Sequence, residues 1–180
     1  AVSSVNRRQG VIRLESPLWR DGWTFAASIE NPQISLEIPP SVSGAARTET
    51  PDFLTHIKLE RNWFEFQAAS VVRRLGFQPD NQDVVAGTAW GFNFSGSIQP
   101  RETTRAYYQI TFGEGIGSYR GSPDVVATGS TTAEVLPVFG WMIGTKHSWS
   151  SSLTSNLTYS ELYADDIPGQ LSSNLSSTSY

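Results

Sequence analysis

Residues 103–112 read TTRAYYQITF, and their side chains alternate between two characters along the chain. One set is mostly apolar and consists of Thr104, Ala106, Tyr108, Ile110 and Phe112. The other set is mostly polar and consists of Thr103, Arg105, Tyr107, Gln109 and Thr111. Successive side chains of a β-strand point to opposite faces, so this period of two predicts a strand with one apolar and one polar face.

The same alternation recurs along most of the chain, in segments rich in Val, Ile, Thr, Tyr, Phe and Trp. Trp90 and Phe92, for example, alternate with Gly91 and Asn93. Stripes of helical period are scarce, so the sequence indicates an all-β protein. It predicts strands at 10–16, 23–30, 53–60, 63–74, 86–98, 103–112, 136–148 and 153–160.

The connections between these segments alternate between short and long. Short ones lie near 17–21, 61–62, 99–102 and 149–150, and long ones, rich in Pro, Gly, Ser, Asp and Asn, lie at 31–51, 76–84, 113–134 and 163–173. An antiparallel meander with this pattern collects tight turns at one end and long loops at the other, which is typical of outer-membrane β-barrels. We therefore predict that residues 1–180 are part of one antiparallel transmembrane β-barrel domain, with about eight strands present.

Composition and charge argue against several other classes. The chain contains 13 Lys and Arg and 17 Asp and Glu, so its net charge is −4. It has no basic block, so nucleic acid is not expected as a partner. The chain has no Cys, which excludes disulfides and thiolate metal sites. No segment approaches the roughly 18 apolar residues of a spanning helix. Any crossing of a membrane would therefore be made by strands.

Signals of catalysis are weak. The two histidines, His56 and His147, lie on separate predicted strands, and no nucleophile elbow is present. The glycines between 113 and 121 follow a strand and open no helix, so they do not predict a nucleotide site. Asp165-Asp166 precedes a Pro-Gly turn, where carboxylates are usually solvated. We predict that the protein is not an enzyme and has no cofactor.

The tryptophans favour a membrane protein. Trp19, Trp23, Trp63 and Trp149 all lie beside short connections, and indole side chains concentrate at membrane interfaces. The alternative is a soluble secreted β-sandwich or small barrel that binds carbohydrate or another ligand through exposed Trp and Tyr. The polar face, with Arg, Glu, Lys and His near strand middles, is more typical of a water-filled lumen.

Six motifs carry a resemblance to a known family. They are Phe25-Ala-Ala-Ser-Ile-Glu-Asn-Pro32, Pro51-Asp-Phe53, Trp63 to Leu75 ending in Val71-Val-Arg-Arg-Leu75, Ala89-Trp-Gly-Phe-Asn-Phe-Ser-Gly96, Thr111-Phe-Gly-Glu-Gly-Ile-Gly-Ser-Tyr-Arg120 and Ile143-Gly-Thr-Lys-His-Ser-Trp149. In this order and spacing, across roughly residues 7–166, the chain resembles the DcaP-type trimeric outer-membrane porins, which pass dicarboxylates and other small anions.

The resemblance implies a sixteen-stranded barrel, of which this chain would be an interior stretch holding about half the strands. It also implies a homotrimer in the outer membrane of a Gram-negative-type bacterium, with outer-membrane lipid and small anionic solutes as partners. The chain departs from the family because the N-terminal coiled-coil segment and the closing aromatic strand are missing. A self-contained barrel of about eight strands is the competing architecture.

The polar face supplies the candidate site, because charged side chains along a narrow aqueous path set ion selectivity. The residues expected to line the pore are Arg13, Glu15, Glu30, His56, Lys58, Glu60, Glu65, Arg73, Arg105 and Lys146. Arg13, Arg73 and Arg105 are expected to contact an anionic solute, because a guanidinium binds a carboxylate through two hydrogen bonds. Each could equally pair with Glu15, Glu30 or Glu65 on a neighbouring strand and stiffen the wall.

The apolar face is expected to contact lipid. Its predicted lipid-facing residues are Phe25, Phe64, Phe66, Phe92, Phe94, Tyr108 and Ile110. The charges of the long loop 113–134, Glu114, Arg120 and Asp124, are expected to be solvated.

Overall fold

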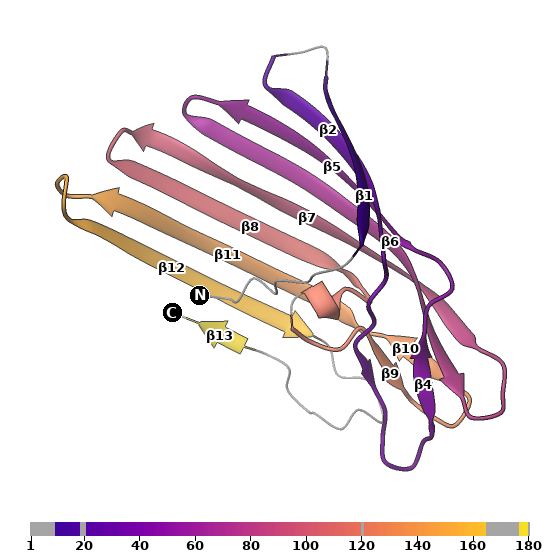
Figure 1. Ribbon diagram of the computed structural model, residues 1–180. Helices are drawn as coiled ribbons and strands as arrows, with labels where there is room; N and C mark the ends of the chain where they lie inside the picture. Colours follow the sequence, from indigo (N-terminus) through magenta and orange to yellow (C-terminus); the bar gives the residue numbers. More distant parts are fainter. Residues whose placement is uncertain (1–9, 19–20, 120, 165–176, 180) are drawn as a thin grey trace.

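A curved antiparallel meander forms most of the computed structural model, which describes residues 10–18, 21–119, 121–164 and 177–179 (Figure 1). Its neighbouring strands follow the order β1-β2-β5-β6-β7-β8-β11-β12-β13. The eight long strands are β1 (Val11–Pro17), β2 (Trp23–Glu30), β5 (Asp52–Arg61), β6 (Phe64–Pro79), β7 (Val85–Arg101), β8 (Thr104–Glu114), β11 (Pro137–Ser148) and β12 (Thr154–Ala164). The short β13 (Ser177–Ser179) pairs with β12, and β4 (Gly44–Arg47) pairs with the far end of β6.

The predicted meander is confirmed, since each predicted segment coincides with one of these eight strands. The sheet does not close on itself, because β1 and the β12–β13 edge are not paired with each other in the described part of the chain. This differs from a self-contained small barrel. Asp165-Asp166, Trp19 and Arg120 lie outside the described residues.

One predicted loop is wrong. The segment 76–84 was expected to be a long connection, but β6 continues to Pro79 and β7 begins at Val85, so only residues 80–84 form the turn. Backbone pairing supports the extension on both sides, because Gly76 to Pro79 pair with β4 while Gly76 and Phe77 pair with β7. Hydrogen bonding to β4 and β7 therefore overrides the preference of residues 76–79 for a turn.

A second, smaller sheet was not predicted from the sequence. It consists of β3 (Leu36–Glu37), β9 (Val125–Ala127) and β10 (Ala133–Val135), and the 3-10 helix η1 (Gly117–Tyr119) precedes β9. We call residues 33–37, 115–119 and 121–136 the loop layer. No helix in the described part of the chain is long and apolar enough to cross a membrane.

The loop layer packs on one face of β6 and β7. Leu75 of β6 and Ala89 of β7 form a small buried cluster with Val125 of β9. Ile34, Leu36, Ala133 and Val135 pack around this cluster. We call the face that carries the loop layer the inner face of the sheet, and the opposite face the outer face.

The outer face is apolar and exposed. Register places the seven predicted lipid-facing residues on it, for example Phe25 opposite Ile57 and Phe94 opposite Ile110. Phe92 is 42% exposed although its ring stacks with Phe94 and makes a tilted contact with Phe112. No second layer of described residues covers this face, so the dry interior of a β-sandwich is not formed. Its other large exposed side chains include Ile12, Leu14, Ile29, Phe53, Val72, Ile98, Phe139, Ile143 and Leu157.

A carboxylate of β12 interrupts the apolar outer face. Glu161 of β12 lies opposite Trp141 and accepts hydrogen bonds from Trp141 Nε1 at 3.1 Å, Tyr163 Oη at 2.5 Å and Tyr159 Oη at 2.5 Å. Three aromatic donors therefore surround the charge. Such bonds offset part of the cost of placing a carboxylate on an apolar surface.

Candidate functional site

Register places all ten charged residues predicted to line a pore on the inner face. In each pair of neighbouring strands, directly opposed residues share a face, and Lys146 lies opposite Arg105 while Lys58 lies opposite Gln67. The ten residues are Arg13, Glu15, Glu30, His56, Lys58, Glu60, Glu65, Arg73, Arg105 and Lys146. Alternation along single strands therefore assigned all ten residues to one face of the sheet.

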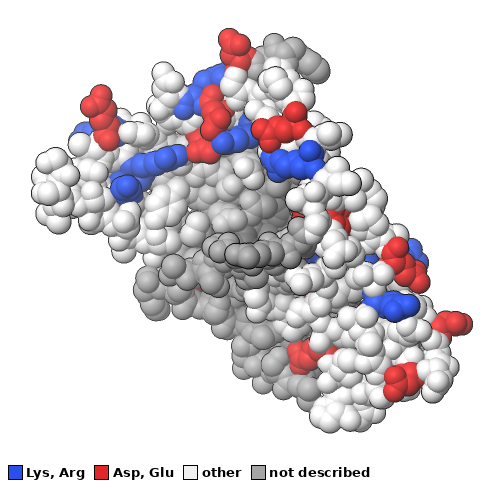
Figure 2. Space-filling model, viewed as in Figure 1, with Lys and Arg blue, Asp and Glu red and all other residues white. Residues whose placement is uncertain are grey.

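Most of these charges gather near the short turns. Figure 2 shows a band of Lys, Arg, Asp and Glu side chains over this end of the hollowed face. Within the band, Lys58 Nζ lies 2.6 Å from Glu60 Oε1 and 3.3 Å from Glu65 Oε1, and Arg105 Nη2 lies 2.8 Å from Glu65 Oε2. Ion pairs thus connect β5, β6 and β8 across the sheet.

Arg13 lies at the β1 end of this band. Its Nη2 is 2.7 Å from Glu15 Oε2 and 3.2 Å from Nε2 of His56. Glu30, nearer the loop layer, accepts a hydrogen bond from Ser28 Oγ at 3.1 Å. Arg13 and Arg105 therefore pair with glutamates of the sheet, as the alternative expectation stated. Arg13 differs from it in one respect, because its partner Glu15 lies on the same strand.

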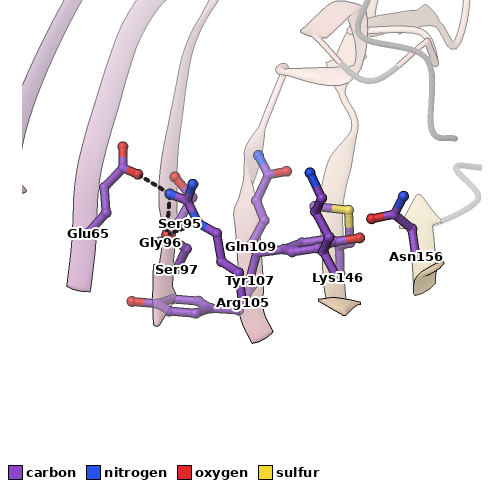
Figure 3. Close-up of a pocket in the computed structure, with 11 residues that line it drawn as sticks. Glu65, Ser95, Gly96, Ser97, Arg105, Tyr107, Gln109, Lys146 and Asn156 are labelled. Atoms are coloured by element: carbon purple, nitrogen blue, oxygen red, sulfur yellow. Dashed lines mark hydrogen bonds and ion pairs between the residues drawn. The ribbon is translucent and has the colours of Figure 1, made fainter. Parts of the chain in front are cut away.

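A hollow of about 430 Å³ opens on the inner face beside this band (Figure 3). It forms because β7 contributes the small residues Ser95, Gly96 and Ser97, whereas β8 and β11 contribute long side chains. The hollow is lined by Glu65, Ser95, Gly96, Ser97, Arg105, Tyr107, Tyr108, Gln109, Met142, Lys146 and Asn156. Hydroxyl, amide and cationic groups therefore line the same hollow.

Only some of the hydrogen-bond donors of Arg105 bind other residues of the protein. Its Nε donates to Ser97 Oγ at 2.9 Å, and its Nη2 donates to Ser97 Oγ and Glu65 Oε2. The side chain remains 49% exposed, so the ion pair with Glu65 contributes only about 0–1 kcal/mol. Nη1 has no partner among the described residues, which leaves donors facing the hollow.

Lys146 is the second cation of the hollow. It is exposed, it lies directly opposite Arg105, and the described residues provide it with no ion pair or hydrogen bond. Two adjacent like charges repel each other, and an anion between them would relieve that repulsion. The pair Arg105–Lys146 is therefore the basic part of the hollow. Alternation in the sequence predicts both residues on the polar face, but it does not predict that they lie side by side.

Arg73 is placed differently from the expectation. It lies on the inner face, but it is only 2% exposed, because the loop layer covers it. Its partners are Asp52, whose Oδ2 lies 2.9 Å from Nε, and Asp124, whose Oδ1 lies 3.2 Å from Nη1. A guanidinium enclosed in this way cannot contact a solute in a channel. The expectation that Asp124 is solvated is wrong for the same reason, since Asp124 is fully buried.

No group of three or more His, Asp and Glu side chains that could hold a metal ion occurs among the described residues.

The architecture is that of the wall of an outer-membrane-type β-barrel, with the sheet left unclosed. Among solved structures, the outer membrane channel DcaP of Acinetobacter baumannii matches this fold with a TM-score of 0.71 at 13% sequence identity. The match covers 87% of this chain and 44% of that chain, so this chain corresponds to about half of that barrel. The predicted similarity to the DcaP fold is confirmed. No family model and no curated protein matches the sequence.

Proposed function

We propose that this chain forms part of the wall of a passive, non-enzymatic diffusion channel in a bacterial outer membrane. The observation that carries the proposal is the division between the two faces of one sheet. The outer face exposes a largely apolar surface, and the inner face carries charges and a polar hollow. Water on the inside and hydrocarbon on the outside satisfy both surfaces at once.

The tryptophans of the short turns support this orientation. Trp63 and Trp149 are 62% and 67% exposed, and both lie at the turn end of the sheet. Exposed indoles are costly in water and stable at the level of lipid headgroups. Outer-membrane lipid is therefore the proposed partner of the outer face, with the turns at one membrane interface.

We further propose that the channel favours small anions, with Arg105 and Lys146 as the residues that contact them. The support is their adjacency, their exposure and the incomplete pairing of both cations. Weak contacts of this kind allow a solute to enter and also to leave. Dicarboxylates as solutes and a homotrimer as the assembly are proposals that rest on the sequence resemblance.

Replacing both Arg105 and Lys146 with Gln in the full-length protein should lower the preference for anions. A cation about 5 Å from a passing anion contributes about 1 kcal/mol in water, so loss of the pair should reduce the anion-to-cation permeability ratio roughly fivefold or more. Reversal potentials across planar bilayers in a salt gradient measure this ratio. The matched control is Arg101→Gln, which removes an exposed cation at a turn outside the hollow. An unchanged reversal potential in the double variant would refute the anion site.

A further inference from the structure

Arg73 is the largest of the fully buried side chains, and it lies where the loop layer meets the barrel wall. Its side chain begins on the inner face of β6, and its carboxylate partners come from two places. Asp52 is the first residue of β5 in the wall, whereas Asp124 precedes β9 in the loop layer. One cation therefore connects the wall to the structure that covers it.

The guanidinium also holds the backbone of the loop layer. Nη1 donates to the carbonyl oxygen of Gly115 at 2.9 Å and to Ser118 Oγ at 3.1 Å. Nη2 donates to the carbonyl oxygen of Gln33. These acceptors belong to both parts of the loop layer, the connection before β3 and the connection after β8. Arg73 thus fixes two loops that are distant in sequence.

Asp124 joins the same two loops to each other. Its Oδ2 accepts from the backbone N–H of Ser35 at 2.9 Å, and its Oδ1 accepts from the backbone N–H of Ser118 at 2.7 Å. Its own N–H donates to the carbonyl oxygen of Ser35 at 2.8 Å. The ion pair between Arg73 and Asp124 therefore holds two loops that are already hydrogen-bonded to each other.

Tyr119 of η1 also packs against the buried Arg73 side chain. The Arg73 guanidinium carbon lies 5.1 Å from the centre of the Tyr119 ring, and Tyr119 Oη donates to Asp52 Oδ2 at 3.2 Å. Burial raises the pKa of Tyr119, so its hydroxyl keeps the proton that it donates.

We propose that Arg73 is a positioning residue that clamps the loop layer to the barrel wall, so that the width of the channel depends on this one side chain. This inference rests on the proposed channel function. The layer lies on the inner face, so it occupies cross-section that a solute would otherwise use. Its apolar contact with the wall includes the buried Leu75, Ala89 and Val125, and the bonds of Arg73 add a polar attachment to this contact.

The first test is Arg73→Gln in the full-length protein, with single-channel conductance in planar bilayers as the measurement. Loss of the clamp should release the loop layer and raise the conductance on the order of twofold, with larger open-channel noise, because conductance follows the open cross-section. The matched control is Arg74→Gln, which removes the neighbouring exposed cation on the opposite face of β6 and should leave the conductance unchanged.

The second test restores the clamp by another bond. A Cβ added at Gly91 of β7 would lie 2.8 Å from Ile116 Cγ2, so the pair Gly91→Cys and Ile116→Cys places two sulfurs within reach of a disulfide. The sequence contains no Cys, so this disulfide has no competitor within these 180 residues. In the Arg73→Gln background, oxidation should return the conductance to the parental value, and reduction should raise it again.

These outcomes separate the clamp from the proposed function. If the parent protein conducts and Arg73→Gln conducts equally, the clamp is refuted, and the same holds if oxidation of the cysteine pair does not restore the parental conductance. A parent protein that conducts no ions refutes the channel instead. Should Arg73→Gln fail to assemble, Ser118→Ala, which removes one of the donated bonds, must give a smaller rise in conductance, and parental conductance in that variant overturns the proposal.

Discussion

Full-length protein that carries Phe92→Lys is expected to lose most of its assembly into lipid bilayers. Phe92 points to the outer face, is 42% exposed and lies within a group of aromatic rings. A lysine near the middle of the lipid-facing surface costs roughly 2–4 kcal/mol, and 2.7 kcal/mol corresponds to about a hundredfold change in the folding equilibrium. The lost contacts with Phe94 and Phe112 add to this cost.

Folding into lipid vesicles, followed by the change in gel mobility of the folded barrel, measures the effect. The matched control is Ser95→Lys, which adds the same cation three residues further along β7 but on the inner face, beside the hollow. The control should assemble nearly as well as the parent protein. Equal assembly of the two variants would show that the outer face does not contact hydrocarbon.

Asp124→Ala is expected to destabilise the folded protein by roughly 3–5 kcal/mol, because it removes one partner of a buried ion pair. Arg73 would keep Asp52 as its carboxylate, and the backbone N–H groups of Ser35 and Ser118 would lose their acceptor. A buried donor without an acceptor adds a cost of about 1–3 kcal/mol, which is not additive with the ion-pair loss.

Urea unfolding of the full-length protein in vesicles would measure this change. Asp83→Ala serves as the control, because Asp83 is an exposed carboxylate in the turn between β6 and β7 and should change the free energy of unfolding by no more than about 0.5 kcal/mol. If Asp124→Ala behaves like this control, the buried network does not hold the loop layer.

The meander could be predicted because its signal is local. In 103–112 and 86–98, each residue's neighbours in sequence decide which face it takes, and one buried or lipid-covered face requires strict alternation. The assignment of Arg105 and Lys146 to one polar face followed from the same rule. The position of Arg105 directly opposite Lys146 could not be predicted, because it depends on strand register, which local alternation does not specify.

The loop layer could not be predicted in the same way. Arg73 binds groups at Gln33, Asp52 and Asp124, which are distant in the chain and belong to three different segments. The loop 113–134 is rich in Gly, Ser and Thr, and that composition suggested solvated structure. A weak signal was present in Val125 and Val126, two adjacent apolar residues in a polar loop, both of which are buried in the structure.

The division of the sheet into a lipid face and a water face can be measured by spin labelling of single cysteines in the full-length protein in vesicles. The 180 residues contain no Cys, so labels can be placed one at a time at Phe94, Ser95, Gln109 and Ile110. Labels at Ser95 and Gln109 should collide with a water-soluble nickel complex, and labels at Phe94 and Ile110 should collide with oxygen dissolved in the bilayer. Equal or reversed accessibility of the two pairs would contradict the proposed channel.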